Sequence, residues 1–82
     1  MKGYHYVYTL QSISFPDKHY TGQTQALHER LAEHNDRKVP YTSKFAPWII
    51  RTATAFRNKE RAIAFERYLK SGSGKAFLQR HL

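Results

Sequence analysis

The sequence predicts a small α+β domain in which two strands, a helix, a third strand and two further helices follow in order (ββαβαα). At 82 residues the chain is below the size at which proteins split into domains, so residues 1–82 are expected to form one unit. The chain has no cysteine, which excludes a disulfide framework, a zinc ribbon and a thiol nucleophile. Segments with strand character alternate with segments of helical periodicity, and together these observations favour the mixed class.

The first two strands are predicted to form an antiparallel hairpin. Residues 4–10 are rich in tyrosine and other strand formers. Turn residues follow at 14–17, and residues 18–21 are suited to the returning strand. Gly22 is expected to end that strand, where the backbone bends or is closely approached. The even-numbered face of the first strand carries Tyr4, Tyr6, Tyr8 and Leu10.

Thr24 is suited to cap a helix over residues 25–35 with Leu27 and Leu31 on one stripe. The segment 36–47 contains two prolines and is expected to be a long loop. Residues 48–56 begin with β-branched and aromatic side chains and are predicted to form the third strand.

Two helices complete the predicted order. Asn58 is suited to cap a helix over residues 59–71, and Gly72 is expected to end it in the left-handed conformation. Ser73 is then expected to cap a short helix over 74–81, anchored by Phe77 and Leu78.

The net charge of +8 is concentrated in the second half of the chain. Residues 1–41 carry five basic and four acidic groups, whereas residues 42–82 carry nine basic groups and two acidic ones. Such a field attracts polyanions, and it favours nucleic acid as the partner over a merely solvated surface. A membrane is disfavoured because no apolar span, signal peptide or basic amphipathic helix is present, so a cytoplasmic location is expected.

Polar side chains occupy core-facing positions of two predicted helices. Glu66 falls inside the apolar stripe between Ile63 and Leu69 at 100° per residue. A carboxylate there pairs with a cation, binds a metal or has a raised pKa, and an ion pair with a buried arginine is the structural alternative. Arg30 and His34 lie one turn apart beside the leucines of the earlier helix, where packing alone is again the alternative.

These residues resemble the GIY-YIG nuclease superfamily over nearly the whole chain. Tyr6-Val7-Tyr8 and Tyr20-Thr21-Gly22 are similar to its two tripeptides. The order continues with Arg30, His34 and Glu66 at the positions that the helical wheels identify. The segment 68–74 and the Pro47-Trp48 pair are similar to the short stand-alone bacterial members.

The resemblance implies a three-stranded antiparallel sheet flanked by helices and a phosphodiesterase site with one divalent metal, Mg²⁺ or Mn²⁺. It implies that Tyr8 is the general base, that Tyr20 orients water or phosphate and that Arg30 neutralises charge on the phosphoryl oxygens. It further implies that His34 supports the hydrogen bonds and that Glu66 holds the metal. A tyrosine serves as base only if the metal, Arg30 or another cation lowers its pKa toward neutral, and Lys18 and Lys70 are the other candidate cations.

The chain departs from the family pattern at three places. Tyr6 replaces a glycine and Thr21 an isoleucine, and neither change removes a reactive group. No asparagine follows Glu66, although many family members place one after the last helix, so the resemblance does not assign that phosphate or leaving-group contact to a residue of this chain. Without a separate recognition domain, any preference is expected to come from the loop 38–44, the basic second half or a partner.

The leading hypothesis is a metal-dependent endonuclease of low sequence specificity that acts on structured, damaged or single-stranded DNA. The alternative is a non-catalytic nucleic-acid-binding module that retains the fold, which the charge, the exposed aromatics and the absent asparagine support. A third interpretation is an interaction subunit that delivers a partner nuclease. An inward Glu66 is explained by catalysis and not by binding, which ranks the nuclease first.

Overall fold

The computed structural model describes residues 3–82, and it confirms the predicted order of elements. Two strands are followed by a helix and a short 3₁₀ turn (η1), and a third strand by two helices. Their bounds are β1 His5–Ser12, β2 His19–Thr24, α1 Leu27–Asn35, η1 Ser43–Phe45, β3 Trp48–Phe56, α2 Lys59–Lys70 and α3 Gly72–His81.

The three strands form one antiparallel sheet in the order β2-β1-β3, so β1 lies in the centre. Tyr8 of β1 pairs with Gly22 on β2 and with Ala53 on β3. The register between β1 and β3 shifts at Thr9/Leu10. The three-stranded antiparallel fold is therefore confirmed.

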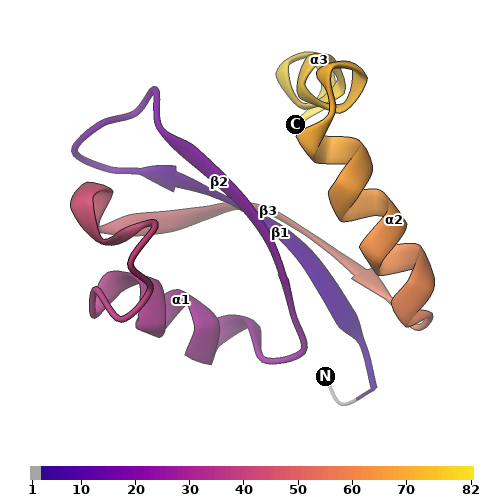
Figure 1. Ribbon diagram of the computed structural model, residues 1–82, viewed down its shortest axis with the longest axis horizontal. Helices are drawn as coiled ribbons and strands as arrows, with labels where there is room; N and C mark the ends of the chain where they lie inside the picture. Colours follow the sequence, from indigo (N-terminus) through magenta and orange to yellow (C-terminus); the bar gives the residue numbers. More distant parts are fainter. Residues whose placement is uncertain (1–2) are drawn as a thin grey trace.

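The two faces of the sheet are covered by different parts of the chain, as Figure 1 shows. Tyr8 and Leu10 pack with Trp48 and with Leu27 and Leu31 of α1. On the opposite face Val7 packs with buried Ala62 and Leu69 of α2, and with partly buried aromatic and leucine side chains of β3, α2 and α3: Phe56, Phe65, Phe77 and Leu78. Alternation along β1 thus sends one set of side chains to each layer.

Gly22 does not end β2, as expected, but lies inside it opposite Tyr8. A Cβ atom at this position would stand 2.6 Å from Tyr8 Oη and 2.9 Å from Tyr20 Cε2. The glycine is therefore required by the close approach of two aromatic rings, and β2 continues to Thr24 because its backbone still pairs with β1.

The start of α1 also differs from the expectation. The helix begins at Leu27 after Ala26, which makes no side-chain cap. The Thr24 hydroxyl instead accepts a hydrogen bond of 3.0 Å from the backbone N–H of Ala26, so it stabilises the turn between β2 and α1.

Asn58 caps α2 as predicted, because its side chain accepts a hydrogen bond of 3.0 Å from the N–H of Arg61. The predictions for Gly72 and Ser73 were wrong. Ser71, in an extended conformation, both ends α2 and caps α3, and its hydroxyl accepts a bond of 3.1 Å from Gly74 N–H. Gly72 is already the first residue of α3. Within residues 3–82, no helix has the length and apolarity needed to cross a membrane.

Candidate active site

A chain of buried hydrogen bonds links β1 to α1 and to the loop that follows it. The Tyr8 hydroxyl lies 2.9 Å from Nε2 of His34, and Nδ1 of His34 lies 2.7 Å from Oγ1 of Thr42. All three residues are at most 1% exposed. Sequence periodicity placed His34 on the core side of α1, and the structure confirms this position.

The Thr42 hydroxyl sets the direction of this chain. It donates a hydrogen bond of 3.3 Å to the backbone carbonyl of Val39, and therefore accepts from Nδ1–H of His34. A neutral imidazole with its proton on Nδ1 offers a lone pair at Nε2, so the Tyr8 hydroxyl donates to Nε2. A bond of 3.0 Å from Trp48 Nε1–H to the Thr42 carbonyl holds the loop in place.

Burial determines the protonation of both rings. It raises the pKa of Tyr8 above its usual value of 10.0, and the nearby Arg30 guanidinium only partly opposes this effect. Burial also lowers the pKa of His34 below 6.5, and the positive charge of Arg30 lowers it further. The resting pair is therefore a neutral phenol that donates to a neutral imidazole.

Of the three candidate cations, Arg30 is the one beside Tyr8, and its guanidinium acts to lower the pKa of the phenol against the larger effect of burial. Its guanidinium also pairs with Glu33 at 3.1 Å, and its side chain is 34% exposed. The other two candidate cations lie elsewhere: Lys18 Nζ stands 5.5 Å from the centre of the Phe45 ring, and Lys70 binds Glu66.

Tyr20 joins the same cluster from β2. Its ring centre lies 5.0 Å from that of His34 and 6.3 Å from that of Tyr8. Both tyrosines point to the α1 face of the sheet, and the missing side chain at Gly22 leaves room for them. The structure thus brings together four of the five predicted site residues: Tyr8, Tyr20, Arg30 and His34.

Glu66 approaches the same edge strand from the opposite layer. Its Oε1 accepts a hydrogen bond of 3.3 Å from Nε2 of Gln23, and its Oε2 one of 2.9 Å from Nζ of Lys70. The Glu66 side chain is 20% exposed, and its partner is a lysine one turn along α2, not the buried arginine of the structural alternative. The negative charge of Glu66 contributes to the raised pKa of Tyr8, so the two groups lie within electrostatic range across β2.

The donor atoms near Glu66 are suited to a hydrated magnesium ion. Gln23 Oε1 is buried and has no hydrogen-bond partner among residues 3–82, although an amide oxygen is a hard ligand. The same residues contain no group of three or more His, Cys, Asp or Glu side chains that could hold a metal. Because Mg²⁺ keeps several waters and binds one or two carboxylates, the single carboxylate of Glu66 fits it, and Gln23 Oε1 is a further hard donor on the amide that contacts this carboxylate through Nε2.

Sequence reasoning missed Thr42 and Gln23. Thr42 lies in a segment expected to be loop, and no local pattern connects it to His34, eight residues earlier. Gln23 follows the second tripeptide on β2, and its alternation with Gly22 places it on the α2 face. That alternation was a usable signal, because it pairs an amide with the face from which Glu66 approaches.

Comparisons with known proteins show the family and the fold of this chain. The GIY-YIG catalytic domain family matches residues 4–79. A UPF0213 protein from Bacillus halodurans, solved by solution NMR, is 31% identical and superposes with a TM-score of 0.56, covering 94% of this chain and 83% of its own. No curated protein matches the chain.

Proposed function

This chain belongs to the GIY-YIG nuclease superfamily, and on that premise we propose that it is a metal-dependent endonuclease that hydrolyses phosphodiester bonds in DNA. The observation that carries the proposal is the directed chain from Tyr8 through His34 to Thr42, with Arg30 beside it. A buried phenol whose proton already points at a neutral imidazole is arranged for proton transfer.

Tyr8 and His34 act together as the general base in this proposal. The phenol oxygen takes a proton from the attacking water while its own proton passes to Nε2 of His34. The raised pKa of Tyr8 makes a free phenolate rare at neutral pH, so the coupled transfer replaces it. The lowered pKa of His34 leaves Nε2 unprotonated at rest, and it also makes the imidazolium a stronger acid, so His34 holds the proton only transiently. Because Tyr8 is 1% exposed, the proposal requires the attacking water to be bound within the protein next to the phenol oxygen.

Arg30 and Tyr20 position the phosphate. The Arg30 guanidinium carries a permanent charge and multiple donors, which suits it to the oxygens of the pentavalent transition state. Glu33 holds this guanidinium at 3.1 Å and so restricts its orientation. The hydroxyl of Tyr20 orients water or phosphate from the neighbouring strand. The packing of the Tyr20 ring against His34 holds this hydroxyl in position.

Glu66 is the residue that holds the metal in this proposal, and the amide group of Gln23, whose Nε2 donates to Glu66 Oε1, carries an oxygen without a partner among residues 3–82. Nucleases of this superfamily generally use a divalent metal, and Mg²⁺ or Mn²⁺ would supply charge stabilisation for the phosphate. When no metal ion is bound, Lys70 neutralises the Glu66 carboxylate, because its Nζ lies 2.9 Å from Glu66 Oε2.

The experiment compares wild type with Glu66→Gln and Tyr8→Phe on labelled single-stranded, duplex and branched DNA, with Mg²⁺, Mn²⁺ or EDTA. We expect wild type to cut only with metal and each variant to lose about 100-fold or more in rate. Both substitutions preserve side-chain size, and Lys59→Gln on the exposed start of α2 is the control. If wild type binds DNA but yields no metal-dependent product, the proposal fails and the non-catalytic binding module takes its place.

A further inference from the structure

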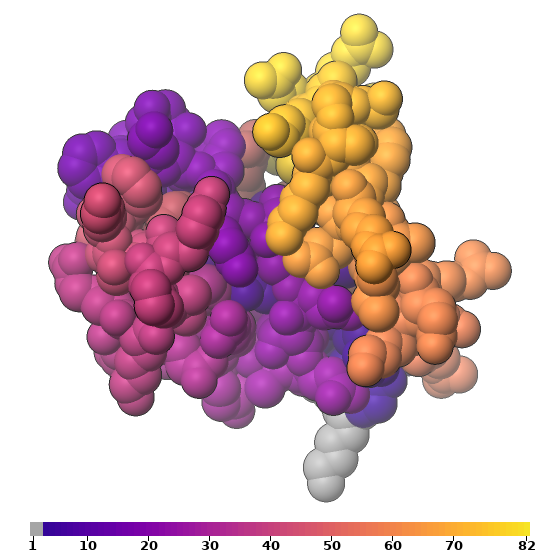
Figure 2. Space-filling model, viewed as in Figure 1, coloured from indigo at the N-terminus to yellow at the C-terminus, as the bar shows by residue number. Residues whose placement is uncertain are grey.

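A pocket of about 640 Å³ lies along the edge strand β2, between the loop that follows α1 and the helices α2 and α3. Figure 2 shows the hollow between the magenta loop segment and the orange and yellow helices. Tyr20 lines the pocket, so the pocket adjoins the Tyr8–His34 cluster, but most of it lies on the opposite face of the sheet.

The floor of this pocket combines threonines of the sheet with Leu69 of α2 and Leu78 of α3. Thr21, Thr9 and Thr52 stand in register across the three strands, and Thr9 Oγ1 lies 2.6 Å from Thr52 Oγ1. Thr9 and Thr21 line the pocket directly. The Thr9 and Thr52 hydroxyls satisfy each other, so the floor offers a ligand the Thr21 side chain together with the apolar surface of the two leucines.

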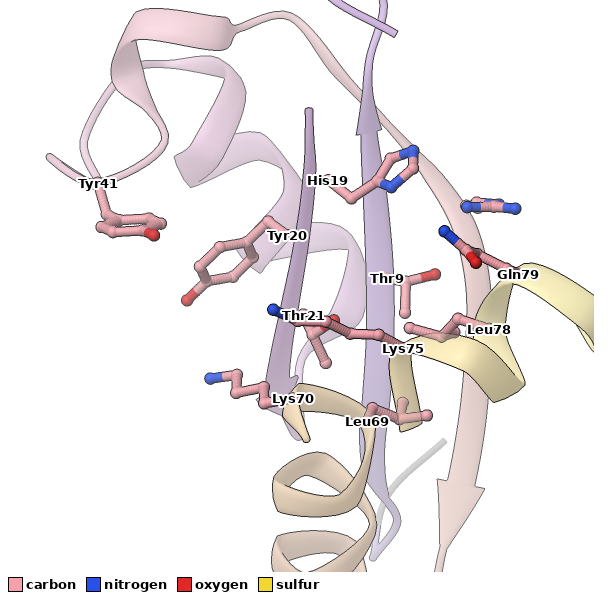
Figure 3. A pocket seen from close by; sticks show the side chains of 11 residues that line it. Thr9, His19, Tyr20, Thr21, Tyr41, Leu69, Lys70, Lys75, Leu78 and Gln79 are labelled. Atoms are coloured by element: carbon pink, nitrogen blue, oxygen red, sulfur yellow. The ribbon is translucent and has the colours of Figure 1, made fainter. Parts of the chain in front are cut away.

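The walls of the pocket are basic. Lys70 of α2, Lys75 of α3 and Arg51 of β3 line it, together with His19, and none of its lining residues is acidic. Lys70 and Lys75 extend toward the side on which Tyr20 and Tyr41 lie, as Figure 3 shows. Lys75 makes no ion pair within the described chain, so its charge is available to an anion.

Tyr41 adds an exposed aromatic face at the mouth of the pocket. Its side chain is 81% exposed, and its ring centre lies 6.0 Å from that of Tyr20. An aromatic ring that solvent reaches, next to lysine ammonium groups, is the combination with which proteins bind unpaired bases and their phosphates.

We propose that this pocket binds an unpaired segment of the nucleic-acid strand, with phosphates at Lys75 and Arg51 and a base stacked on Tyr41. The inference rests on the proposed function, and it adds where the nucleic acid binds and that the bound segment is unpaired. The volume falls within the range of about 300–1,000 Å³ typical of small-ligand pockets, so unpaired nucleotides can enter it, whereas bases that stay paired and stacked in a duplex cannot. Tyr20, shared by the pocket and the cluster, connects the bound segment to the scissile phosphate.

The test measures fluorescence anisotropy of a labelled oligothymidine and of a matched duplex, in EDTA so that no cleavage occurs. Lys75→Glu is compared with Lys59→Glu, which makes the same charge change on the exposed start of α2, outside the pocket. We expect Lys75→Glu to weaken oligothymidine binding about tenfold more than its control and to reduce the slope of log affinity against log salt by about one. Equal effects of the two substitutions would overturn the proposal.

Tyr41→Ala gives a second, independent readout. Its exposure means that removal of the ring leaves the fold intact, and we expect single-strand affinity to fall about fivefold or more while Tyr41→Phe keeps it. An equal loss for the duplex, or tighter binding of the duplex by wild type, refutes an unpaired segment. Binding of inorganic phosphate or thymidine monophosphate as tight as that of the oligonucleotide would also refute a strand. Cleavage is measured separately, so an inactive protein that still shows the Lys75 effect retains the pocket and loses only the nuclease.

Discussion

The two sides of β2 differ in how completely their polar groups are satisfied. On the α1 side, Tyr8, His34 and Thr42 are buried and each hydrogen bond has a fixed direction. On the α2 side, Glu66 is bound by a half-exposed lysine and by Gln23, whose own oxygen has no partner among residues 3–82. The α1 side is therefore closed, because its buried polar groups bond one another without a ligand. The α2 side is open, because the amide oxygen of Gln23 has no partner among residues 3–82.

The difference fits the two tasks that the proposed function gives to the two sides. A proton transfer needs atoms at fixed positions, which a buried and fully bonded network provides. A site that takes up a cation or phosphate must exchange partners, and an exposed lysine leaves a carboxylate at little cost. Gly22 lies between them, since Tyr8 and Tyr20 approach its backbone from one side and its neighbour Gln23 reaches Glu66 on the other.

Gly22→Ala is expected to have the largest effect on stability and cleavage, because it disrupts the buried hydrogen bonds on the α1 side. The added methyl group would meet Tyr8 Oη at 2.6 Å, so the phenol must move away from His34. We expect a loss of about 1–3 kcal/mol in the free energy of unfolding, measured by urea denaturation, together with loss of cleavage. Gly72→Ala is the control, since nothing lies within 4 Å of its added carbon, and it should leave stability unchanged or raised. Equal stability of the two variants would contradict the close approach.

Thr42→Val tests the direction of the hydrogen bonds with a smaller change in volume. It removes the acceptor of Nδ1–H and leaves a buried imidazole N–H unpaired, at a cost of about 1–3 kcal/mol. We expect ¹⁵N NMR of the His34 ring to show the Nδ1–H tautomer in wild type and in Thr42→Ser, and a mixture in Thr42→Val. A dominant Nε2–H tautomer in wild type would reverse the proposed role of Tyr8 as donor.

The pH dependence of the free energy of unfolding tests the contribution of His34 on the α1 side. The pKa of His34 is lowered on folding, so its contribution is present above pH 6.5 and is lost as the pH falls through the folded-state pKa. We expect the free energy of unfolding to decline below pH 6.5, by no more than about 1.4 kcal/mol per pH unit from this group. His34→Gln should flatten that decline in thermal melts between pH 7.5 and pH 5, and an unchanged slope would show that His34 is not the responsible group.

Glu33→Gln is expected to have the smallest effect. The ion pair with Arg30 joins side chains that are 34% and 48% exposed, and such pairs contribute less than about 0.5 kcal/mol to folding. Cleavage should fall modestly, because Arg30 loses a restraint but keeps its charge. If Glu33→Gln lost more stability than Thr42→Val, the partly exposed Arg30–Glu33 ion pair would stabilise the α1 side more than the buried hydrogen bonds do.

Periodicity sufficed for the elements and for the faces on which the site residues lie. The third strand and the Asn58 cap were predicted at their observed positions, because alternation and capping act through near neighbours. The same local reasoning misplaced the boundary between α2 and α3. Both serine-glycine pairs at 71–74 satisfy the local rules for a cap, and the packing of Gly74 against the backbone of Tyr68 and Leu69 favours the earlier one.

The sequence by itself determined the basic charge of the second half, the mixed fold and the inward positions of Arg30, His34 and Glu66. Only the tertiary structure decided which atoms these side chains meet. Thr42 reaches His34 because the loop folds back and Trp48 holds it, and Gln23 reaches Glu66 because α2 packs across the edge strand. Helical and strand periods specify a face, whereas hydrogen-bond partners from distant segments are set by how the layers pack.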